Sequence, residues 1–388
     1  MKRADFASDA PGMFITNLGR FLTFVPNPLP PNFALDPETI DLALRAERSV
    51  GGLAEIGRIL PNPHLLINPF LRREAVLSSR IEGTHADVEQ LALFEAEPSE
   101  SAATADVQEV NNYLRAMQHG LSRLMQTHIS LQLIREMHAI LLAGVRGEEK
   151  QPGEFRTRQN WIGYGGRGIE GARYVPPAVQ PMMDALNDLE RFITTTDDSL
   201  FLIKLASIHY QFEAIHPFLD GNGRIGRLLI TLLLCERGYL PSPLLYLSAY
   251  FERHRDKYLD HLWFVSQKGD WKAWVDFFLR GVAEQSRDGI NRAQQLQRLW
   301  QRYRHLAQMR RSTKLVQLVD QLFISPAVTA TQAARLLDIT PRAAQQNIEK
   351  LVAIGIVREV TGRHWRRIYL ASELVDIITV DEAPAPTP

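Results

Sequence analysis

The sequence predicts a mainly α-helical protein that carries a β-hairpin flap and ends in a winged helix-turn-helix. Three observations lead to this fold class. Apolar residues recur three or four positions apart through most of the chain, the period of a helix with one buried face. Glycines alternate with Tyr and Ile over residues 159–176, which indicates a hairpin or flap rather than a core strand. Residues 312–372 alternate short helical and strand patterns around turns.

The first part of the chain is predicted to be an extended lead-in followed by a helix. Residues 1–36 are rich in Pro and Asn, and we expect them to wrap on a later domain. Asp36 and Pro37 mark a helix start, because a capping side chain precedes a proline at the first helical position. This helix should continue to about Gly57.

The other elements before the C-terminal part follow from the same apolar period. A loop is expected over the small, acidic residues 95–105. Helices are expected over residues 69–93, 107–144 (broken near Gly120 and Thr127), 181–194, 200–214, from about 224 to 236 (ended by Gly238), and 245–308, with a polar bridging helix over 284–311.

Composition sets the broad class of protein. A chain of 388 residues exceeds one compact core, and we expect three parts: residues 1–105, 106–311 and 312–388. Lys and Arg together number 44, as do Asp and Glu, so the overall charge directs the chain to neither nucleic acid nor membrane. The single cysteine, Cys235, lies in an apolar run and has no disulfide partner in the chain. Without a signal sequence or a membrane span, a cytoplasmic location is expected.

Residues 216–227 combine groups suited to phosphate chemistry. Gly221 and Gly223 bracket Asn222 just before an apolar helix, where backbone N–H groups and the helix dipole favour an anion. Two further groups come before this cradle in the sequence. Asp220 offers an oxygen ligand for Mg²⁺, and a neutral His216 could accept a proton from an attacking hydroxyl.

Two arginines complete this set. Arg224 and Arg227 are three positions apart, so both lie on one helix face and can grip phosphate oxygens. Together these residues indicate phosphoryl or nucleotidyl transfer. The alternative is structural: a glycine-rich turn between two helices with a buried histidine.

The segment resembles the signature of the Fic family, His-x-Phe-x-(Asp/Glu)-Gly-Asn-Gly-Arg-x-x-Arg, at every fixed position. The resemblance implies a Fic-type helical core and a protein adenylyltransferase, which moves AMP from ATP to a Tyr, Thr or Ser hydroxyl. It implies that His216 is the general base and that Asp220 holds Mg²⁺. The expected ATP contacts are Gly221, Asn222, Gly223, Arg224 and Arg227. A related kinase branch lacks the second glycine, so Gly223 favours AMP transfer.

A second motif, Ser78-Ser79-Arg80-Ile81-Glu82-Gly83, resembles the family's inhibitory motif. The resemblance implies that Ser78 and Glu82 are the fixed residues of this inhibitory motif, and that Glu82 pairs with Arg227 and takes the space and charge meant for the γ-phosphate. The alternative is an ordinary exposed helix carboxylate. In some relatives this glutamate also helps to remove AMP, and the sequence leaves open whether it does so here.

The resemblance also covers the flap and the nucleotide base. The family docks a target segment on the flap by strand addition, whereas the plain alternative is a surface hairpin. Tyr250 and Tyr258 lie in the region that borders the adenine pocket in relatives, and Tyr250 is the expected base contact. His254 and Leu259 stand where relatives often have Asn and Tyr.

The pattern of the C-terminal unit is typical of a winged helix-turn-helix. Helices are expected over residues 314–323, 331–337 and 342–353, and strands over 355–358 and 366–369. Residues 314–372 contain eight Lys and Arg against four Asp and Glu, a net charge of +4. Residues of the third helix (Arg342, Gln345, Gln346, Lys350) could enter a major groove while Arg363, Arg366 and Arg367 meet phosphates.

The alternative for this unit is a protein-contact or dimerisation module. A second overall hypothesis follows: a DNA-binding regulator whose core senses nucleotide. The target protein, self-modification and a homodimeric state cannot be decided from the sequence.

Overall fold

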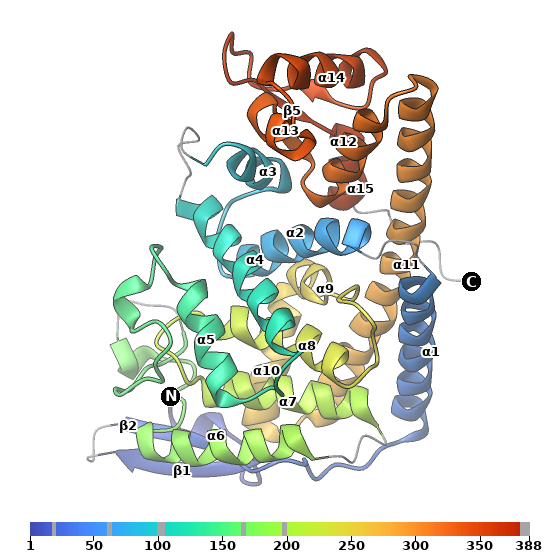
Figure 1. The fold of residues 1–388 in the computed structure, drawn as a ribbon. Coiled ribbons are helices and arrows are strands. Elements are labelled where there is room, and N and C mark those ends of the chain that lie inside the picture. Colours follow the sequence, from blue (N-terminus) through green and yellow to red (C-terminus); the bar gives the residue numbers. More distant parts are fainter. Residues whose placement is uncertain (18–20, 60–63, 99–104, 164–167, 196–199, 381–388) are drawn as a thin grey trace.

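The computed structural model describes residues 1–17, 21–59, 64–98, 105–163, 168–195 and 200–380. The protein is mainly α-helical, and a small C-terminal unit caps one end of a larger helical body (Figure 1). Within the described residues, no helix has both the length and the apolar character needed to cross a bilayer.

The N-terminal segment forms a hairpin that the sequence pattern did not predict. After a 3-10 turn, Arg3–Asp5, strands β1 (Gly12–Asn17) and β2 (Phe21–Pro26) pair antiparallel. The hairpin buries Phe24 completely. As expected, the segment wraps on later residues, since the Phe24 N–H donates to Val175 O at 3.0 Å.

Helix α1 (Pro37–Ile59) starts as predicted, because Asp36 Oδ1 accepts from the Thr39 N–H at 2.8 Å. It packs along the long helix α11 (Trp271–Met309), which includes the polar stretch predicted as a separate helix.

The single helix expected over residues 69–93 is wrong at both ends. Helix α2 (His64–Ile81) starts before Pro69, which costs one backbone hydrogen bond near the helix start. Gly83, at φ 90°, then turns the chain, and Asp87 caps α3 (Val88–Ala96) by accepting from the Gln90 N–H. Of the loop expected over residues 95–105, residues 95 and 96 belong to α3, residue 105 begins the next helix, and residues 99–104 lie outside the described residues.

Seven further helices, α8 among them, build the rest of the body. The predicted break at Gly120 is wrong, because α4 continues past it, and a Cβ there would lie 2.7 Å from Met137 Sδ. These helices are α4 (Ala105–Arg123), α5 (Leu131–Leu141), α6 (Val179–Thr194), α7 (Phe201–Ile215), α8 (Asn222–Glu236), α9 (Ser248–Arg253) and α10 (Arg255–Lys268). Short 3-10 turns lie at Glu148–Lys150 and Gly168–Gly171.

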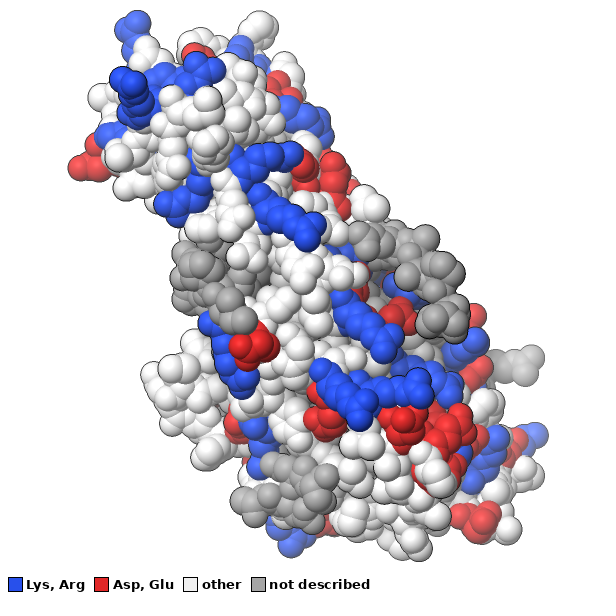
Figure 2. Space-filling model, turned by 90° about the vertical axis from the view of Figure 1, so that its right-hand side faces the viewer, with Lys and Arg blue, Asp and Glu red and all other residues white. Residues whose placement is uncertain are grey.

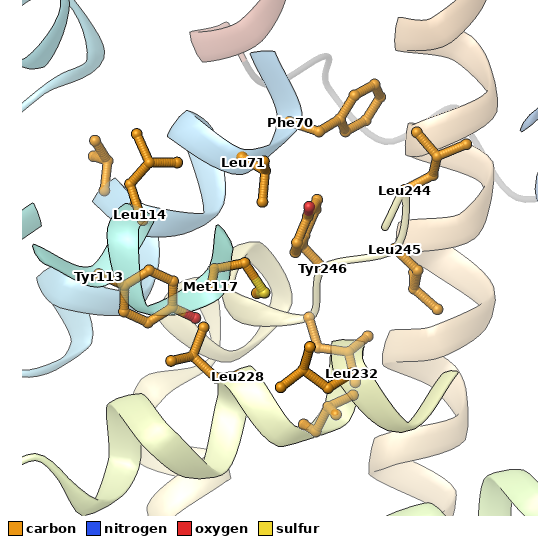
Figure 3. Packing of buried hydrophobic residues seen from close by; sticks show 14 of the residues in the cluster. Phe70, Leu71, Tyr113, Leu114, Met117, Leu228, Leu232, Leu244, Leu245 and Tyr246 are labelled. Atoms are coloured by element: carbon orange, nitrogen blue, oxygen red, sulfur yellow. The ribbon is translucent and has the colours of Figure 1, made fainter. Parts of the chain in front are cut away.

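The core lies where α2, α4 and α8 meet (Figure 3). Leu228 and Leu232 of α8 lie beside Tyr113 and Met117 of α4, and Leu71 of α2 closes the cluster. Each is at most 3% exposed, and burying one such side chain contributes about 1.5–3 kcal/mol. This core holds the start of α8, and hence the residue 216–227 loop, in a fixed place.

The winged-helix unit comprises residues 313–379. The strands predicted at 355–358 and 366–369 are found slightly later, and β3 and α15 were not predicted. Its sheet order is β3-β5-β4, with both pairs antiparallel. The elements are α12 (Thr313–Ile324), β3 (Ala327–Thr329), α13 (Ala330–Leu337), α14 (Pro341–Ala353), β4 (Arg358–Glu359), β5 (Ile368–Leu370) and α15 (Ser372–Thr379).

Candidate active site

His216 is placed by the sharp turn that ends α7. Its backbone adopts the left-handed conformation (φ 50°), which few non-glycine residues do, and such strain gathers at functional sites. Its Nδ1 lies 3.3 Å from Glu213 O, so Nδ1 carries the proton and Nε2 is left as the proton acceptor. Burial lowers the pKa of His216 to about 4, with Arg156 acting in the same direction. The imidazole is therefore neutral at pH 7.

Two residues that were not predicted from the sequence hold the loop after His216. The buried Arg156 donates from Nε to His216 O at 2.9 Å and from Nη2 to Pro177 O at 2.5 Å. Asn160 Nδ2 donates to Phe218 O at 2.8 Å. Both lie more than 50 positions from the loop, so only the folded chain shows their role.

Phe218 is fully buried and anchors the loop in the core. Its ring stacks on His138 with centroids 3.7 Å apart. His138 Nδ1 accepts from the Gly153 N–H at 2.9 Å, so its Nε2 donates to Asp220 O at 3.0 Å. The residue before the cradle is thus fixed by a buried side chain of α5.

The anion cradle forms where α8 begins. Gly221 takes a left-handed φ of 78°, and the first N–H groups of α8 lack intrahelical partners. The Asn222 side chain turns inward: Oδ1 accepts from the Phe218 N–H at 2.8 Å and Nδ2 donates to Phe218 O at 2.9 Å. In this structure, therefore, the Asn222 side-chain amide closes the loop.

Arg224 and Arg227, which were predicted to grip phosphate together, contact different partners in the structure. Nη1 of Arg224 lies 3.4 Å from Glu109 Oε2, and Nη2 of Arg224 lies 3.5 Å from Asp220 Oδ1. Both Arg224 and Glu109 are buried, and Glu109 also accepts from Thr84 Oγ1 at 2.9 Å. No sequence pattern marks Glu109 as a partner of this arginine.

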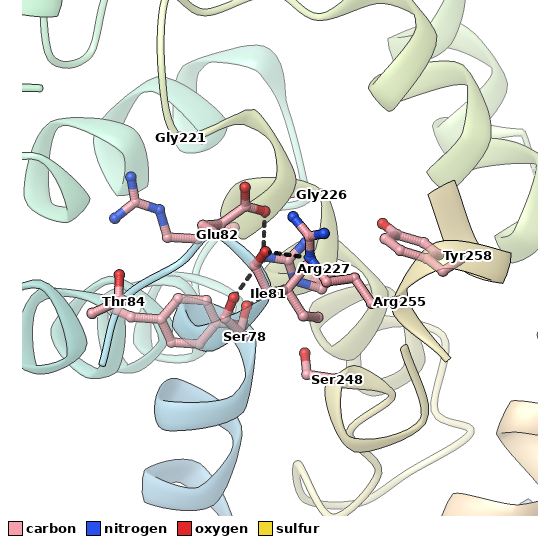
Figure 4. A network of polar contacts seen from close by, with 12 residues as sticks. Ser78, Ile81, Glu82, Thr84, Gly221, Gly226, Arg227, Ser248, Arg255 and Tyr258 are labelled. Carbon is pink, nitrogen blue, oxygen red and sulfur yellow. Dashed lines mark hydrogen bonds and ion pairs between the residues drawn. The ribbon is translucent and has the colours of Figure 1, made fainter. Parts of the chain in front are cut away.

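Arg227 instead contacts the two residues predicted to inhibit (Figure 4). Its Nε donates to Ser78 Oγ and its Nη2 to Ser78 O, both at 2.8 Å. Nη2 also lies 2.8 Å from Glu82 Oε1. The structure therefore brings Ser78, Glu82 and Arg227 together across 149 positions of sequence.

Glu82 lies inside the cradle rather than beside it. A Cβ added to Gly223 would be 2.3 Å from Glu82 Oε1, so only glycine fits under this carboxylate. Burial on its own would raise the pKa of Glu82, but the charge of Arg227 outweighs it and lowers the pKa. The ionised carboxylate of Glu82 thus lies against Arg227 and over Gly223.

Two more carboxyls, of the buried Glu74 and the partly buried Glu213, feel the charge of Arg227 at longer range. Glu74 Oε1 accepts from Tyr113 Oη at 2.9 Å and from Ser248 Oγ at 2.5 Å, and burial raises the pKa of Glu74 to about 7. Burial also raises the pKa of Glu213 to about 8, against the opposing charge of Arg227. Of the three carboxyls, only Glu82 has a lowered pKa.

Asp220 is the candidate metal ligand. Its Oδ1 accepts from the Gly221 N–H at 2.6 Å, and its side chain is 37% exposed beside the cradle. Among the described residues, no group of three or more His, Cys, Asp or Glu is placed to hold a metal ion. One carboxylate next to an anion cradle fits Mg²⁺, which binds through one or two carboxylates plus substrate phosphates.

A cavity of about 340 Å³ opens beside these groups. His216, Glu82, Gly223 and Arg227 line it together with Tyr258, Leu259 and Arg255 from α10. Tyr250, the expected base contact, lines a different cavity, where its ring packs 4.8 Å from that of Phe277. The structure therefore does not bring Tyr250 to His216.

The flap covers one side of the cavity. Ile162 and Tyr174 form a single antiparallel bridge, and Tyr174 Oη donates to Ala214 O at 2.8 Å, next to the end of α7. Ile162 and Gly163 line the cavity, whereas the predicted flap residues 164–167 lie outside the described residues. Trp161, 45% exposed, and Ile162, 37% exposed, leave an apolar edge on the surface.

Three segments match known family models, in the order in which they occur in the fold. Residues 40–122 match the Fic/DOC family N-terminal model, and residues 128–234 match the Fic/DOC family model. Residues 315–368 match a model described as an HTH DNA binding domain.

Similar proteins carry the same family name. The "Protein adenylyltransferase Fic" of Aedes aegypti is 34% identical over 151 residues, which cover 38% of this chain and 27% of that protein. The protein of the same name from Culex quinquefasciatus is 31% identical over 151 residues, with the same coverage. The chain thus spans about a quarter of the length of these relatives.

Two solved structures share the fold. A Fic family protein from Desulfovibrio desulfuricans G20 has a TM-score of 0.57 at 18% identity, covering 88% of this chain and 98% of that one. Fic-1 from C. elegans has a TM-score of 0.50 at 21% identity, covering 68% of this chain and 74% of that one. The chain therefore contains the N-terminal and central domains of the Fic/DOC family, and it shares its fold with a Fic family protein along most of its length.

Proposed function

We propose that this protein transfers AMP from ATP to hydroxyl side chains of other proteins and that Glu82 restrains the transfer. One observation carries the proposal. A neutral His216, with Nε2 as its proton acceptor, shares a cavity with the cradle glycine Gly223 and with Arg227. The relatives named as adenylyltransferases support the same reaction.

The step follows from these positions. The target hydroxyl oxygen attacks the α-phosphorus, and its proton moves to Nε2 of His216. The bond between the α-phosphorus and the oxygen of the departing pyrophosphate breaks, so that the protein carries AMP. Backbone N–H groups of residues 221–223 and the guanidinium groups of Arg224 and Arg227 offset the charge on the phosphates.

We assign Asp220 as the residue that would hold Mg²⁺. The ion, when bound, would supply positive charge that offsets the negative charge of the phosphates. Arg224 lies 3.5 Å from the same carboxylate and would help to orient it. Asn222 would keep the loop closed around this group through its two bonds to Phe218.

We infer that the cavity beside His216 holds the nucleoside. Tyr258, Leu259 and Leu262 supply apolar surface to this cavity. Arg255, at the start of α10, donates from Nε to Ile81 O at 3.0 Å, at the end of the helix that leads to Glu82. Tyr250 has no part in this assignment. The exposed edge at Trp161 and Ile162 would receive the target segment beside the base.

Labelled ATP tests the proposal. The Glu82→Gly chain, incubated with Mg²⁺, ATP labelled at the α-phosphate and a cell extract, should label proteins strongly, and the native chain weakly. The Glu82→Gly/His216→Ala chain should label nothing above background. Omitting the extract separates self-modification from the modification of other proteins. Equal labelling by the single and double variants would exclude His216 as the base.

Glu82 also raises the question of the reverse reaction. A carboxylate that lies beside His216 could help water to remove AMP from a modified target. Purified labelled targets, incubated with native chain and with Glu82→Gln, measure this directly. Faster loss of label with the native chain than with Glu82→Gln would establish that Glu82 helps to remove AMP, and equal rates would exclude that role of Glu82.

A second candidate function, DNA binding by the winged-helix unit, rests on its charge and on its wing. Residues 362–367 are all exposed, and Trp365 at the wing is 85% exposed between arginines. Figure 2 shows Lys and Arg side chains gathered at this end of the molecule. The exposed cations of the unit are Arg335, Arg342, Lys350, Arg358, Arg363, Arg366 and Arg367.

If the chain is a DNA-binding regulator with a nucleotide-sensing core, ATP should bind without any transfer. Retained nucleotide together with an unlabelled extract would favour this candidate. Labelled extract proteins would favour the enzyme, whether or not the unit binds DNA.

A further inference from the structure

Helix α2, which leads to Glu82, lies between the catalytic body and the winged-helix unit. On one side it packs against α4, α8 and α9. On the other, α12 and α15 pack against it, and β3 packs against the neighbouring α3 (Figure 1). The winged-helix unit is therefore seated on the helix that carries the inhibitory motif.

Two adjacent buried arginines tie α2 to this unit. The first is Arg72, which binds Glu95 of α3 from both Nε (2.9 Å) and Nη2 (3.2 Å). The backbone O of Glu95 in turn accepts from Gln332 Nε2 of α13 at 3.3 Å. One polar connection thus runs from α2 through α3 to the winged-helix unit.

The second tie runs through α11. Arg73 Nη1 lies 3.3 Å from Asp288 Oδ2, which also lies 2.8 Å from Arg292 Nε. Arg292, 4% exposed, donates from Nη1 to the backbone O atoms of Ile377, Ile378 and Val380 at 2.6–3.2 Å. Arg292 therefore joins the end of α15 to the carboxylate that holds Arg73.

The far end of α2 sets where the inhibitory carboxylate lies. Ser78 accepts two hydrogen bonds from Arg227, and Glu82 follows one turn later. A helix advances about 1.5 Å and turns about 100° per residue, so a slip of α2 by a single residue would remove Glu82 from Arg227. Anchors at Arg72 and Arg73 prevent such a slip.

We propose that seating of the winged-helix unit on α2 holds Glu82 against Arg227, so that loosening this seat releases AMP transfer. The inference rests on the proposed function and names its regulation. The bistable element is α2, which the winged-helix unit biases at one end and the nucleotide site at the other. A ligand or partner that lifts the unit would act as an activator.

Arg292→Met in the full chain tests the seat, because it keeps the buried aliphatic stem and removes the bonds to α15. Arg298→Met, six residues further along α11 and exposed, is the matched control. We expect Arg292→Met to raise AMP transfer about threefold or more over the native chain, with Arg298→Met unchanged. In the Glu82→Gly background, Arg292→Met should change transfer less than about twofold. An equal rise in both backgrounds, or no rise in the native background, would overturn the proposal.

A second readout does not depend on activity. The N–H groups of Glu82 and Thr84 donate to Ser79 O, and that of Gly83 to Arg80 O. Hydrogen exchange at residues 82–84 should be faster in Arg292→Met than in the native chain. If exchange is faster in Arg292→Met but the Glu82→Gly chain transfers no AMP, the proposed function is rejected and the seating of the winged-helix unit on α2 is supported. Unchanged exchange in a folded variant would reject the seat.

If circular dichroism shows that Arg292→Met does not fold, Asp288→Asn replaces it as the test variant. It keeps the shape of the carboxylate and weakens both arginine contacts. The same direction of change is expected in both readouts, and unchanged transfer and exchange in folded Asp288→Asn would overturn the proposal.

Discussion

Glu82 Oε1 lies 2.8 Å from Nη2 of Arg227 and covers Gly223, so that one carboxylate contacts both the arginine proposed to bind phosphate and the glycine of the candidate anion cradle. Two anions cannot share this space at low cost. Under the proposed function, ATP in a productive pose would have to displace Glu82, so we expect the strength of this contact to limit AMP transfer.

Shortening or neutralising Glu82 should raise transfer in steps. Glu82→Gly empties the cradle and frees Arg227, and we expect about tenfold or more activity over the native chain. Glu82→Gln keeps the bulk but loses the charge, so its rate should lie between the two. Initial rates of AMP incorporation measure this order. Glu149→Gln, at an exposed glutamate, is the matched control and should leave the rate unchanged. A Glu82→Gln rate equal to the native rate would show that charge is irrelevant.

The pH dependence of transfer reports on His216. Because burial lowers the pKa of His216 to about 4, the base is already unprotonated at neutral pH, and kcat/KM should be flat from about pH 6 to 8. It should fall as the pH approaches 4, since imidazolium cannot accept a proton. Glu82 raises the pKa of His216, so in Glu82→Gly the fall should shift further towards acid. A rate that rises through about pH 6.5 in this variant would contradict the burial of the imidazole.

Glu74→Gln should stabilise the protein at alkaline pH. The pKa of Glu74 in the folded state, about 7, exceeds its ordinary 4.5, so its contribution to stability is fully present below pH 4.5 and is lost as the pH rises through 7. The full loss corresponds to about 3 kcal/mol. Urea unfolding at about pH 8.5 should therefore show Glu74→Gln more stable than the native chain by about 1–3 kcal/mol. The difference at about pH 5 should be smaller, and an equal difference at both pH values would exclude the titration of Glu74.

Binding of duplex DNA by the winged-helix unit should depend on its wing and its third helix. Trp365→Ala should weaken binding through loss of an exposed aromatic contact, and Arg342→Ala should lower both the affinity and the salt dependence of binding. Fluorescence anisotropy of labelled duplex at several salt concentrations measures both effects. Met125, 86% exposed and outside the unit, supplies the control Met125→Ala. Equal losses in all three variants would argue against specific docking.

The sequence predicts the site best where the chemistry is local. Residues 216–227 are contiguous, so their types and spacing alone predict a turn, a helix start and an anion cradle. The contact of Glu82 with Arg227 spans 145 positions, and only the resemblance to a family suggested it.

The supporting residues could not be foreseen, because their partners are set by packing. Arg156 and Asn160 reach the loop through backbone carbonyls, which carry no sequence signal. Glu109 meets Arg224 only because α4 lies across α8. Tyr250 illustrates the reverse case: its position in the sequence matched a family pattern, yet its ring packs against Phe277 away from the cavity.

The boundaries of elements were missed for local reasons that the sequence does contain. Pro69 suggested a helix start, but a proline near the beginning of a helix removes only one backbone bond. Gly83 and the Asp87–Gln90 capping pair mark the true end of α2 and start of α3. The division of the chain at residues 105/106 and 311/312 stays a prediction.

The position of the label in ATP tests AMP transfer through His216 most directly. The Glu82→Gly chain is incubated with Mg²⁺ and ATP carrying the label at either the α- or the γ-phosphate. We expect that the α-label enters protein, that the γ-label does not, and that His216→Ala in the same background abolishes incorporation. Incorporation of the γ-label, or α-label incorporation that survives the loss of His216, would contradict this function.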